Sequence, residues 1–418
     1  MNLKTVTILI VILLSHYIAS SQTWNANFNG IDSIWQDLGG DPNIHVLKNI
    51  NSELYLGGPF DNVGTQTVNG IAKYDSISWS GFNNGVDWGN VECIIEYKGE
   101  IVIGGNFTNA DGQANTEAFA IWDGSNWYGL TGLQTTWVWD LEVYNDTLFI
   151  AYQLGDFKGI IAYDGISLLD VGNLNTNWVK TLIVYNDTLY AGGYSGFHKY
   201  MGGTLWEEAH GGTNERVNDM VVDTFNNFLY VGSGGFTVVG GYLPAYPVAI
   251  WDCFSWTSIG TIPNWAIYPK GMAIYRGDLY IGGYLDPYSG KTFNNIARWN
   301  GSVWDTLNGG CSAEVGALEV FKDELYVGGY FDYVDDTMRA YGLASWFVPD
   351  TGCGYLKPRV QTYIDTFYMS NGQAEVQFYN NNVYADSWSW DFGDTVTDTI
   401  KDPAHIYTEK GDYTVQVT

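Results

Sequence analysis

LYLGG at residues 54–58 is the first of seven related pentapeptides in this chain of 418 residues. The others are IVIGG at 101–105, LFIAY at 148–152, LYAGG at 189–193, LYVGS at 229–233, LYIGG at 279–283 and LYVGG at 325–329. Their starting positions lie 47, 47, 41, 40, 50 and 46 residues apart. A period of this length indicates repeated structural units, so the repeat decides how the rest of the sequence is interpreted.

The segments around each pentapeptide have the pattern of short β-strands. A stretch such as VGALEVF at 315–321 precedes the pentapeptide, and an alternating stretch such as IARW at 296–299 follows it. A turn, here Asn300-Gly301, then leads to a fourth stretch such as WDTL at 304–307. Apolar and polar residues alternate with a period of two between Gly-Gly, Asp-Gly or Asn-Gly turns, which is typical of β-hairpins. Four strands per unit predict the blades of an all-β propeller.

The two ends of the repeat array complement each other. The last unit ends at ASW, residues 344–346, without a fourth strand, and the segment SIWQDL at 33–38 has the pattern of that missing strand. We therefore expect this N-terminal segment to complete the final blade, which would close the ring without exposed sheet edges. This closure predicts a seven-bladed β-propeller over residues 22–352.

The repeat resembles that of a known superfamily. The patterns GG-x-F, then IA-x-W-D/N-G, then W-x-x-L-x-x-G are similar to those of the kelch and galactose-oxidase propellers. The resemblance implies a propeller with a funnel at one end of its central channel. It leaves the function open, because such propellers include enzymes, adhesins and scaffolds.

A second domain follows over residues 353–418. The motif SWSWDFGD at 387–394 is followed by P-x-H-x-Y at 403–407 and by GDYTV at 411–415. These motifs resemble the polycystic kidney disease (PKD) family of immunoglobulin-like β-sandwiches. The resemblance implies that Asp391, Asp394 and His405 are turn and packing residues, that the chain is truncated within the last strand, and that the protein is similar to bacterial surface proteins exported by the type IX route.

The N-terminus predicts export. Residues 1–21 have the features of a signal peptide, with Lys4, an apolar run from Val6 to Leu14, and the small residues Ala19-Ser20-Ser21 before the cleavage point. The protein is therefore expected to be secreted and to lie outside the cell or on its surface. With 46 Asp and Glu against 18 Lys and Arg, the formal net charge is −28, which argues against nucleic acid as a partner. The apolar run is too short to span a bilayer, so no membrane insertion is expected.

Four cysteines and five histidines give little material for redox or metal chemistry. The cysteines allow three complete pairings, of which a bridge from Cys311 to Cys353 is the preferred one, with buried free thiols as the alternative. We expect no metal or other cofactor, because the chain has no zinc, P-loop or nucleophile-elbow motif. No catalytic residue is assigned.

Candidate binding residues lie where the repeat is broken. The recurring tryptophans, such as Trp79 and Trp304, are explained by packing within blades. The residue just ahead of each innermost strand and the residue two places on differ between units. In units three to six all of these residues except Asn218 are aromatic or cationic. These candidates are Trp137, Trp139, Trp178, Lys180, Arg216, Tyr268 and Lys270. Units three and four are also short after the pentapeptide, which predicts a lower rim beside the tryptophans.

Such a surface favours a carbohydrate or another surface polymer as ligand, because flat rings stack on sugar faces and cations bind carboxylate or sulfate groups. The first hypothesis is therefore a non-catalytic extracellular binding or adhesion protein, with the second domain as a spacer. A propeller enzyme acting on polysaccharide, a lyase or an oxidase, is the alternative, and a purely structural surface component is a third. Trp137 and Trp178 could also simply plug the channel. The oligomeric state stays open.

Overall fold

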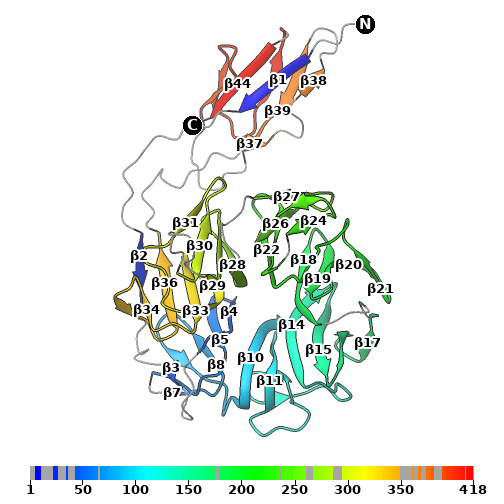
Figure 1. The fold of residues 1–418 in the computed structure, drawn as a ribbon, viewed down its shortest axis with the longest axis vertical. Helices are drawn as coiled ribbons and strands as arrows, with labels where there is room; N and C mark the ends of the chain where they lie inside the picture. The colour runs from blue at the N-terminus through cyan, green and yellow to red at the C-terminus, as the bar shows by residue number, and fades with distance from the viewer. Residues whose placement is uncertain are drawn as a thin grey trace. The chain divides into compact units, whose positions relative to one another are not determined.

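The protein consists of two β-rich units. The computed structural model describes residues 5–10, 22–26, 34–35, 43–64, 66–172, 174, 178–235, 237–245, 247–259, 267–285, 294–348, 360–361, 366–368, 373–380, 388–409 and 411–417. One unit is Thr23–Phe347, and the other combines Met1–Gln22 with Val348–Thr418. Within the described residues the regular structure is β-strand and no helix occurs, which confirms the expected all-β class (Figure 1).

The unit Thr23–Phe347 is a seven-bladed β-propeller, as predicted. Blade 1 contains β4 (Val46–Ile50), β5 (Glu53–Gly57), β8 (Ile71–Tyr74) and β9 (Trp79–Ser80). Blade 2 contains β10 (Val86–Tyr97), β11 (Glu100–Ala110), β12 (Phe119–Trp122) and β13 (Trp127–Tyr128). Blade 3 contains β14 (Trp137–Tyr144), β15 (Thr147–Leu154), β16 (Phe157–Tyr163) and β17 (Leu168–Asp170). Blade 4 contains β18 (Val179–Tyr185), β19 (Thr188–Gly193), β20 (Gly196–Gly202) and β21 (Leu205–Glu208).

The remaining blades follow the same order, from innermost to outermost strand. Blade 5 contains β22 (Asp219–Asp223), β23 (Phe228–Gly232), β26 (Val248–Trp251) and β27 (Trp256–Ser258). Blade 6 contains β28 (Ile267–Tyr275), β29 (Asp278–Leu285), β30 (Ile296–Trp299) and β31 (Trp304–Thr306). Blade 7 contains β32 (Val315–Phe321), β33 (Glu324–Gly329), β36 (Leu343–Phe347) and, from the N-terminal end of the unit, β2 (Thr23–Asn25).

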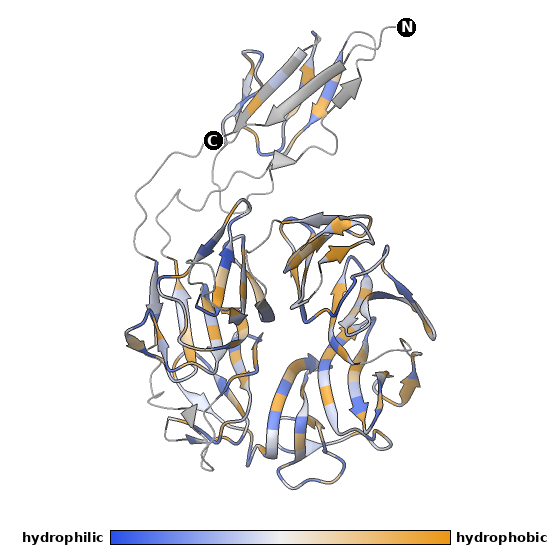
Figure 2. Ribbon diagram, viewed as in Figure 1, coloured by the Kyte–Doolittle hydropathy of each residue, from blue (hydrophilic) through white to orange (hydrophobic). Residues whose placement is uncertain are grey.

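The innermost strands form a closed circle. Each of β4, β10, β14, β18, β22, β28 and β32 contacts the next one, and β32 contacts β4. Apolar and hydrophilic residues alternate along the blade strands, as Figure 2 shows. The apolar residues fill the layers between blades: Ile71, Val91 and Ile103 belong to one such cluster, which joins blades 1 and 2. The alternation that defines the repeat in the sequence is therefore explained by burial between neighbouring blades.

The paired glycines are explained by the same contact. A Cβ on Gly104 would lie 2.4 Å from Val138 Cγ1 of the next blade, and a Cβ on Gly282 would lie 2.3 Å from Val315 Cγ1. Gly328 of blade 7 meets Ile44 before blade 1 in the same way, with 2.6 Å to Cγ2. The first glycine of the pair therefore recurs because the next innermost strand packs directly on its Cα, where no side chain fits.

Closure of the ring by an N-terminal strand is confirmed, but the predicted segment was wrong. Trp24 of β2 lies opposite Trp346 of β36, whereas β3 (Ile34–Trp35) pairs with β6 (Asn62–Val63) beside blade 1. The Trp24 indole N–H donates to the carbonyls of Leu307 (3.3 Å) and Asn308 (3.2 Å) of the preceding blade. Both N-terminal tryptophans fit the outer-strand pattern, and only this long-range packing distinguishes them.

Trp24 repeats contacts seen in other blades. Trp127 donates its indole N–H to the Phe82 carbonyl at 3.1 Å, and Trp206 donates to the Val171 carbonyl at 2.9 Å. In each case the acceptor follows the outermost strand of the preceding blade. Trp24, Trp127 and Trp206 are thus packing residues that join neighbouring blades at their outer edges.

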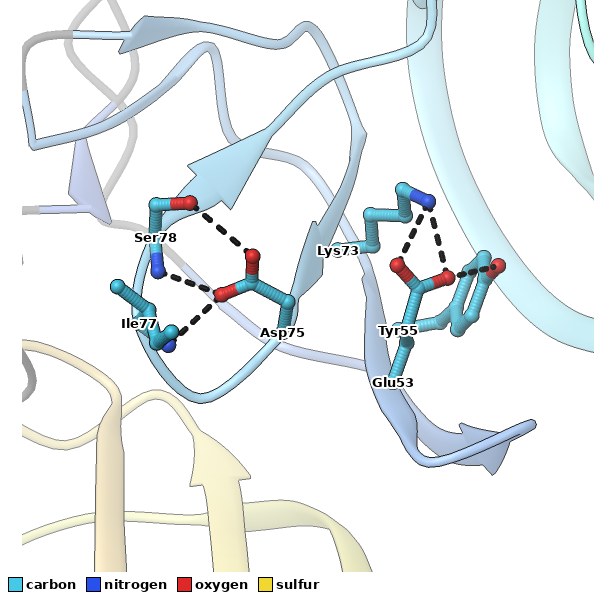
Figure 3. Close-up of polar contacts among 6 residues, drawn as sticks. All are labelled: Glu53, Tyr55, Lys73, Asp75, Ile77 and Ser78. Carbon is cyan, nitrogen blue, oxygen red and sulfur yellow. Dashed lines mark hydrogen bonds and ion pairs between the residues drawn. The ribbon is translucent and has the colours of Figure 1, made fainter.

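The outermost hairpins are held by side-chain turns. In blade 1 the Asp75 carboxylate accepts the backbone N–H groups of Ile77 and Ser78, both at 2.7 Å (Figure 3). Asp123, Asp164, Asp252 and Asn300 make the equivalent contacts in blades 2, 3, 5 and 6. Figure 3 also shows Lys73 on β8 paired with Glu53 on β5 at 2.8 Å. Acidic residues in the repeat therefore have local structural partners, which accounts for part of the acidic composition.

Three blades carry additional ribbons between their second and third strands. They are formed by β6 with β7 (Gln66–Thr67), by β24 (Val238–Val239) with β25 (Leu243–Pro244), and by β34 (Tyr333–Val334) with β35 (Met338–Arg339). Blades 3 and 4 have tight turns there instead, because Leu154 pairs with Phe157 and Gly193 pairs with Gly196. The expected short connections of these two blades are therefore present.

The second unit has a sheet with the order β38-β1-β44-β41-β42 and the pairs β39–β43 and β37–β40. Its strands are β1 (Thr5–Ile10), β37 (Val360–Gln361), β38 (Thr366–Tyr368), β39 (Ala374–Gln377), β40 (Tyr379–Asn380), β41 (Trp390–Asp391), β42 (Thr397–Asp398), β43 (Ala404–Tyr407) and β44 (Gly411–Val417). Val376, Phe378, Trp390, Phe392 and Tyr407 belong to its core. Part of the predicted signal peptide, Thr5–Ile10, runs parallel to β44.

The motif residues of this unit have structural partners. His405 Nε2 lies 2.7 Å from Asp394 Oδ2, and its ring stacks on Phe392 with the centroids 4.2 Å apart. Asp391 accepts the backbone N–H of Gly393 at 2.9 Å. Thr395 has φ = 75°, a left-handed conformation that glycine adopts more readily. This threonine is therefore the one strained residue of the motif.

The predicted disulfide is not confirmed. Cys311 is buried and its thiol is free, as are those of Cys93 and Cys253. Cys353, the other half of the expected pair, lies outside the described residues. Burial raises the pKa of the Cys93 and Cys311 thiols well above the ordinary value, which keeps both protonated and unreactive. No helix in the described part of the chain is long and apolar enough to cross a membrane.

Candidate functional site

The broken positions of the repeat lie where the innermost strands begin, an end that we call the mouth of the ring. Register shifts occur there in five blades, for example between Val138 and Asp140 and between Pro269 and Gly271. The residue at each shift is Glu92, Trp139, Lys180, Lys270 or Gly316. A residue in a β-bulge does not take part in the regular hydrogen-bond ladder between the two strands. Equivalent positions of the repeat can therefore carry different side chains.

Polar groups occupy the mouth on blades 1 and 2. His45 Nδ1 lies 3.0 Å from Glu92 Oε2 and 3.2 Å from the Asn90 amide nitrogen. Asn90 also donates to Glu92. These three side chains satisfy one another, so this side of the mouth has few polar groups left for a ligand.

Three predicted tryptophans meet on blades 3 and 4. The rings of Trp137 and Trp139 stack with centroids 4.4 Å apart and 10° between their planes, and Trp178 lies 6.1 Å from Trp139. The Trp178 indole N–H donates to Gln153 Oε1 at 3.0 Å. The indole N–H groups of Trp137 and Trp139 have no acceptor among the described residues, although Trp79, Trp256 and Trp304 share this state. All three mouth tryptophans are half-buried, so each keeps an accessible surface.

Cations lie against these rings. Lys180 Nζ stands 3.4 Å from the centroid of a Trp139 ring, and Lys158 Nζ stands 4.8 Å from that of Trp178. The Arg216 guanidinium lies between two tyrosines, 5.5 Å from the Tyr194 ring centroid and 5.1 Å from that of Tyr268. Such cation–π contacts hold a positive charge without neutralising it.

The contacts continue around the ring to blade 7. Tyr194 packs edge-on against Trp178 at 4.9 Å and accepts a hydrogen bond from Arg216 Nη1 at 3.2 Å. Lys270 of blade 6 forms an ion pair with Glu314, which precedes blade 7. All seven predicted site residues are thus brought together over blades 3 to 6. We call the set Trp137, Trp139, Trp178, Tyr194, Tyr268, Lys158, Lys180, Arg216 and Lys270 the aromatic–cationic arc.

Burial and neighbouring charges act on Lys180. Burial, opposed by Glu92 and assisted by the positive charges of Lys270 and Arg216, lowers the pKa of its ammonium group to about 8. The residues that act on Lys180 come from blades 2, 5 and 6. Charges on different blades of the mouth therefore influence the protonation of one side chain. Near neutral pH, a fraction of Lys180 is therefore uncharged.

Sequence reasoning missed several members of this surface. Tyr194, Tyr284 and Tyr330 are 40%, 51% and 43% exposed, and each follows the Gly-Gly pair of its blade. Tyr284 lies opposite Tyr268 in the β28–β29 ladder, and the Tyr330 N–H bonds to the Glu314 carbonyl at 2.8 Å. The variable residue after the glycine pair was the signal that could have identified them.

A second group of charges lies deeper along the innermost strands. Burial raises the pKa of Asp140 to about 6, of Glu142 to about 7 and of Asp219 to about 8, and it also raises the pKa of Glu319. The Lys48 ammonium opposes the rise at all four carboxyl groups, so it lies within electrostatic range of blades 3, 5 and 7. We call these five residues the axial cluster. Lys48 is exposed although it lies on an innermost strand, so water reaches it there.

Two axial carboxylates join neighbouring blades. Asp140 Oδ2 accepts the backbone N–H of Leu182 on β18 at 2.6 Å, and its Oδ1 accepts that of Leu141 at 2.8 Å. Asp219 accepts from the Met220 N–H at 2.8 Å and also from Met272 on β28. The innermost strands have an unpaired inner edge, and these carboxylates bind its free N–H groups.

The histidines are dispersed. His45 is engaged by Glu92, whereas His210 lies 6.1 Å from the Trp251 ring, on the connection between blades 4 and 5. Among the described residues, no group of three His, Cys, Asp or Glu side chains could hold a metal ion.

Comparison with protein families identifies the C-terminal region. Residues 368–418 match the family model of the PKD domain, in agreement with the motifs of the sequence. No curated protein matches the chain.

Solved structures superpose on this chain at low sequence identity. The extracellular domain of a protein described as a hybrid two-component system of B. thetaiotaomicron superposes with a TM-score of 0.51 at 13% identity, over 86% of this chain and 46% of that one. This chain therefore spans about half the length of that protein. The WD40 β-propeller domain of Doa1 gives a TM-score of 0.48 at 13% identity, over 75% of this chain and 95% of that one. At such identities the similarity concerns the fold alone.

Proposed function

We propose that this protein is a non-catalytic extracellular binding or adhesion protein whose propeller recognises carbohydrate through the aromatic–cationic arc. In this proposal residues 1–21 direct export, a kelch-like propeller carries the recognition surface, and the PKD domain is a spacer. The type IX route is the proposed export pathway. The observation that carries the proposal is the continuous contact of Trp137, Trp139 and Trp178 with one another and with cations at the mouth.

The physical argument is the match between this surface and a sugar chain. Trp137 and Trp139 stack face to face, and Lys180 lies over a Trp139 ring. The half-buried rings of Trp137 and Trp178 keep accessible apolar surface, and such aromatic surface stacks on the apolar faces of pyranose rings. Gln153 and the cations supply polar groups beside them. The tight turns of blades 3 and 4 leave the tryptophans without a flanking ribbon, in contrast to blades 1, 5 and 7. An extended polymer can therefore approach the arc from that side.

The competing interpretation is that the tryptophans only fill the mouth. Trp178→Ala distinguishes the two, with Phe254→Ala as the matched control, since Phe254 is an aromatic residue that is 81% exposed on an outer hairpin. We expect Trp178→Ala to weaken binding on a glycan array by at least about tenfold, which corresponds to about 1.4 kcal/mol, with little change in melting temperature. Phe254→Ala should change neither. A large fall in melting temperature with unchanged binding would support the filling role.

A second candidate function, eliminative cleavage of a polyuronate, is favoured by the lowered pKa of Lys180 beside Arg216. In that reaction the Lys180 amine would take the proton next to the sugar carboxylate, which Arg216 would neutralise. The electron pair would form a carbon–carbon double bond and expel the glycosidic oxygen, which would take a proton from a tyrosine hydroxyl such as that of Tyr268. Incubation of the protein with a polyuronate tests this function. If an unsaturated sugar is released, as measured by its ultraviolet absorbance, the protein is a lyase and not a non-catalytic binding protein.

A further inference from the structure

We propose that the polymer bound by the aromatic–cationic arc is anionic, and that its carboxylate or sulfate groups bind between Lys180 and Arg216. This inference rests on the proposed carbohydrate-binding function and specifies the charge of the ligand. It follows from the way in which cations are distributed in a strongly acidic chain.

Among the cations for which the structure describes a contact, six have an acidic partner, and Lys322 and Arg339 rest singly on aromatic rings that are not part of the arc. The pairs are Lys73 with Glu53, Lys98 with Asp146, Lys199 with Glu207, Lys270 with Glu314, Arg276 with Asp323 and Arg298 with Asp278. Lys158, Lys180 and Arg216 have no ion pair among the described residues, although the whole chain has 46 acidic residues against 18 basic ones. Three cations without acidic partners are thus grouped in one arc.

Grouping like charges raises their free energy unless an opposite charge is added. Lys180 shows this directly, because the charges of Lys270 and Arg216 each lower its pKa. An anionic group placed between Lys180 and Arg216 would reverse this effect. Polar groups of a neutral sugar would not.

Arg216 has the geometry for such a group. Its guanidinium plane is held by Tyr194 and Tyr268, and the contact with the Tyr194 hydroxyl uses Nη1. A guanidinium has five N–H donors in a fork that matches the two oxygens of a carboxylate or sulfate. Immobilisation between two rings lowers the entropy cost of forming that pair.

The axial cluster limits where the anion binds. Asp140, Glu142, Asp219 and Glu319 lie further along the innermost strands, with Lys48 as the cation among them. The axial carboxyl groups that are ionised at a given pH, beginning with Asp140 and its pKa of about 6, repel an anionic polymer, whereas the cations of the mouth attract it. It should therefore lie across the mouth, along the stacked tryptophans, and not thread into the ring.

The protonation of Lys180 gives a second readout. Its charge is set by burial and by Glu92, Arg216 and Lys270, the groups that face it. An anion binds the protonated form more strongly, so affinity should be full below the free-protein pKa of about 8 and should fall as the pH rises through it. Binding near that pH should therefore take up a proton. Calorimetry in buffers with different ionisation enthalpies measures that proton directly.

The experiment uses the full chain with three soluble polymers: polygalacturonate, which carries carboxylates; dextran sulfate, which carries sulfates; and neutral dextran. Lys180→Met combined with Arg216→Met tests the two cations. Lys322→Met combined with Arg339→Met is the matched control, because those cations also rest on rings, of Phe321 and Tyr341, away from the arc. Lys180→Arg keeps the charge at every pH used.

We expect one or both polyanions to bind and dextran to bind at least about tenfold more weakly. The double variant of the arc should lose at least about tenfold in affinity, the control should bind as the parent protein does, and Lys180→Arg should bind without the pH dependence. Selective binding of polygalacturonate identifies carboxylate as the source of the charge, and selective binding of dextran sulfate identifies sulfate.

Two results would overturn the inference. If dextran binds as strongly as the polyanions, or if the double variant keeps full affinity, the arc does not select an anion, and only the carbohydrate-binding function remains. If Trp178→Ala changes the binding of no polymer and no glycan on an array, the proposed function fails as well. Circular dichroism and melting temperature of each variant show whether the fold is intact.

Discussion

The mouth and the axis of the ring carry opposite kinds of ionisable side chain on the same circle of innermost strands. At the mouth, Lys180 and Arg216 stand beside tryptophan and tyrosine rings, and Lys270 pairs with Glu314. A few residues further along these strands, the axial cluster has four carboxyl groups around Lys48. The innermost strands of neighbouring blades supply both the mouth and the axis. The mouth and the axis therefore differ in their side chains and not in their backbone structure.

This contrast shows how a repeat acquires a site. Asp140 accepts the backbone N–H of Leu182 and Asp219 that of Met272, each on the next blade, so both residues contribute to holding the ring together. The cations at the mouth have aromatic neighbours but few acidic partners, so they contribute little to the ring and remain available to a ligand. Structure and recognition are thus separated along the strand.

The largest expected effect on stability comes from opening the ring, because both the mouth and the axis depend on the closed ring. Trp24→Ala removes a buried indole, its edge contact with Trp346 at 4.9 Å and two hydrogen bonds. We expect a loss of about 3 to 5 kcal/mol in the free energy of unfolding, measured by urea denaturation. Trp35→Ala is the matched control and should cost less. The reverse order would mean that the segment around Trp35 closes the ring.

A smaller effect should separate the axis from the mouth by pH. The folded-state pKa of Asp219 is raised from 3.8 to about 8, so the folded protein binds more protons than the unfolded chain between these values. Stability should therefore fall as the pH rises from about 4 to about 8, and Asp219→Asn should reduce that fall by at least about 1 kcal/mol. Melting temperatures across this range test it. Equal slopes in both proteins would show that Asp219 does not titrate in the folded state.

The smallest effect is expected from Lys48→Met. This change removes the cation of the axial cluster, but Lys48 is exposed, so the loss should be at most about 1 kcal/mol. It should appear near pH 8, where the four carboxyl groups carry most charge, and vanish near pH 4. Binding at the mouth should stay unchanged. A loss of polymer binding in this variant would show that the ligand reaches the axis.

The fold was predictable because its signal is repeated. The alternating strand occurs seven times, and five of these occurrences end in a glycine pair, so the blades are recognised even where one unit departs from the pattern. The closing strand was mispredicted because it occurs once. Trp24 and Trp35 are equivalent by local pattern, and the choice depends on packing against Trp346, more than three hundred residues away in sequence.

The candidate site was predictable only in part, for the opposite reason. Trp137, Trp178 and Arg216 stood out because they interrupt the repeat at positions whose place in a blade is known. Tyr194 and Lys158 were missed, because their approach to Trp178 depends on the tight turns of blades 3 and 4. The axial cluster was missed because acidic residues are abundant in this sequence, and only the circle of strands shows which of them meet.

The closing strand also determines how the propeller would bear mechanical load. Strand β36 leads toward the second unit, and it lies between β33 on one side and β2 on the other. Tension transmitted through the C-terminal part of the chain would therefore act on a strand that is clamped along both edges. Hydrogen bonds in two ladders would have to shear together, whereas a strand at a free edge could be peeled away one bond at a time.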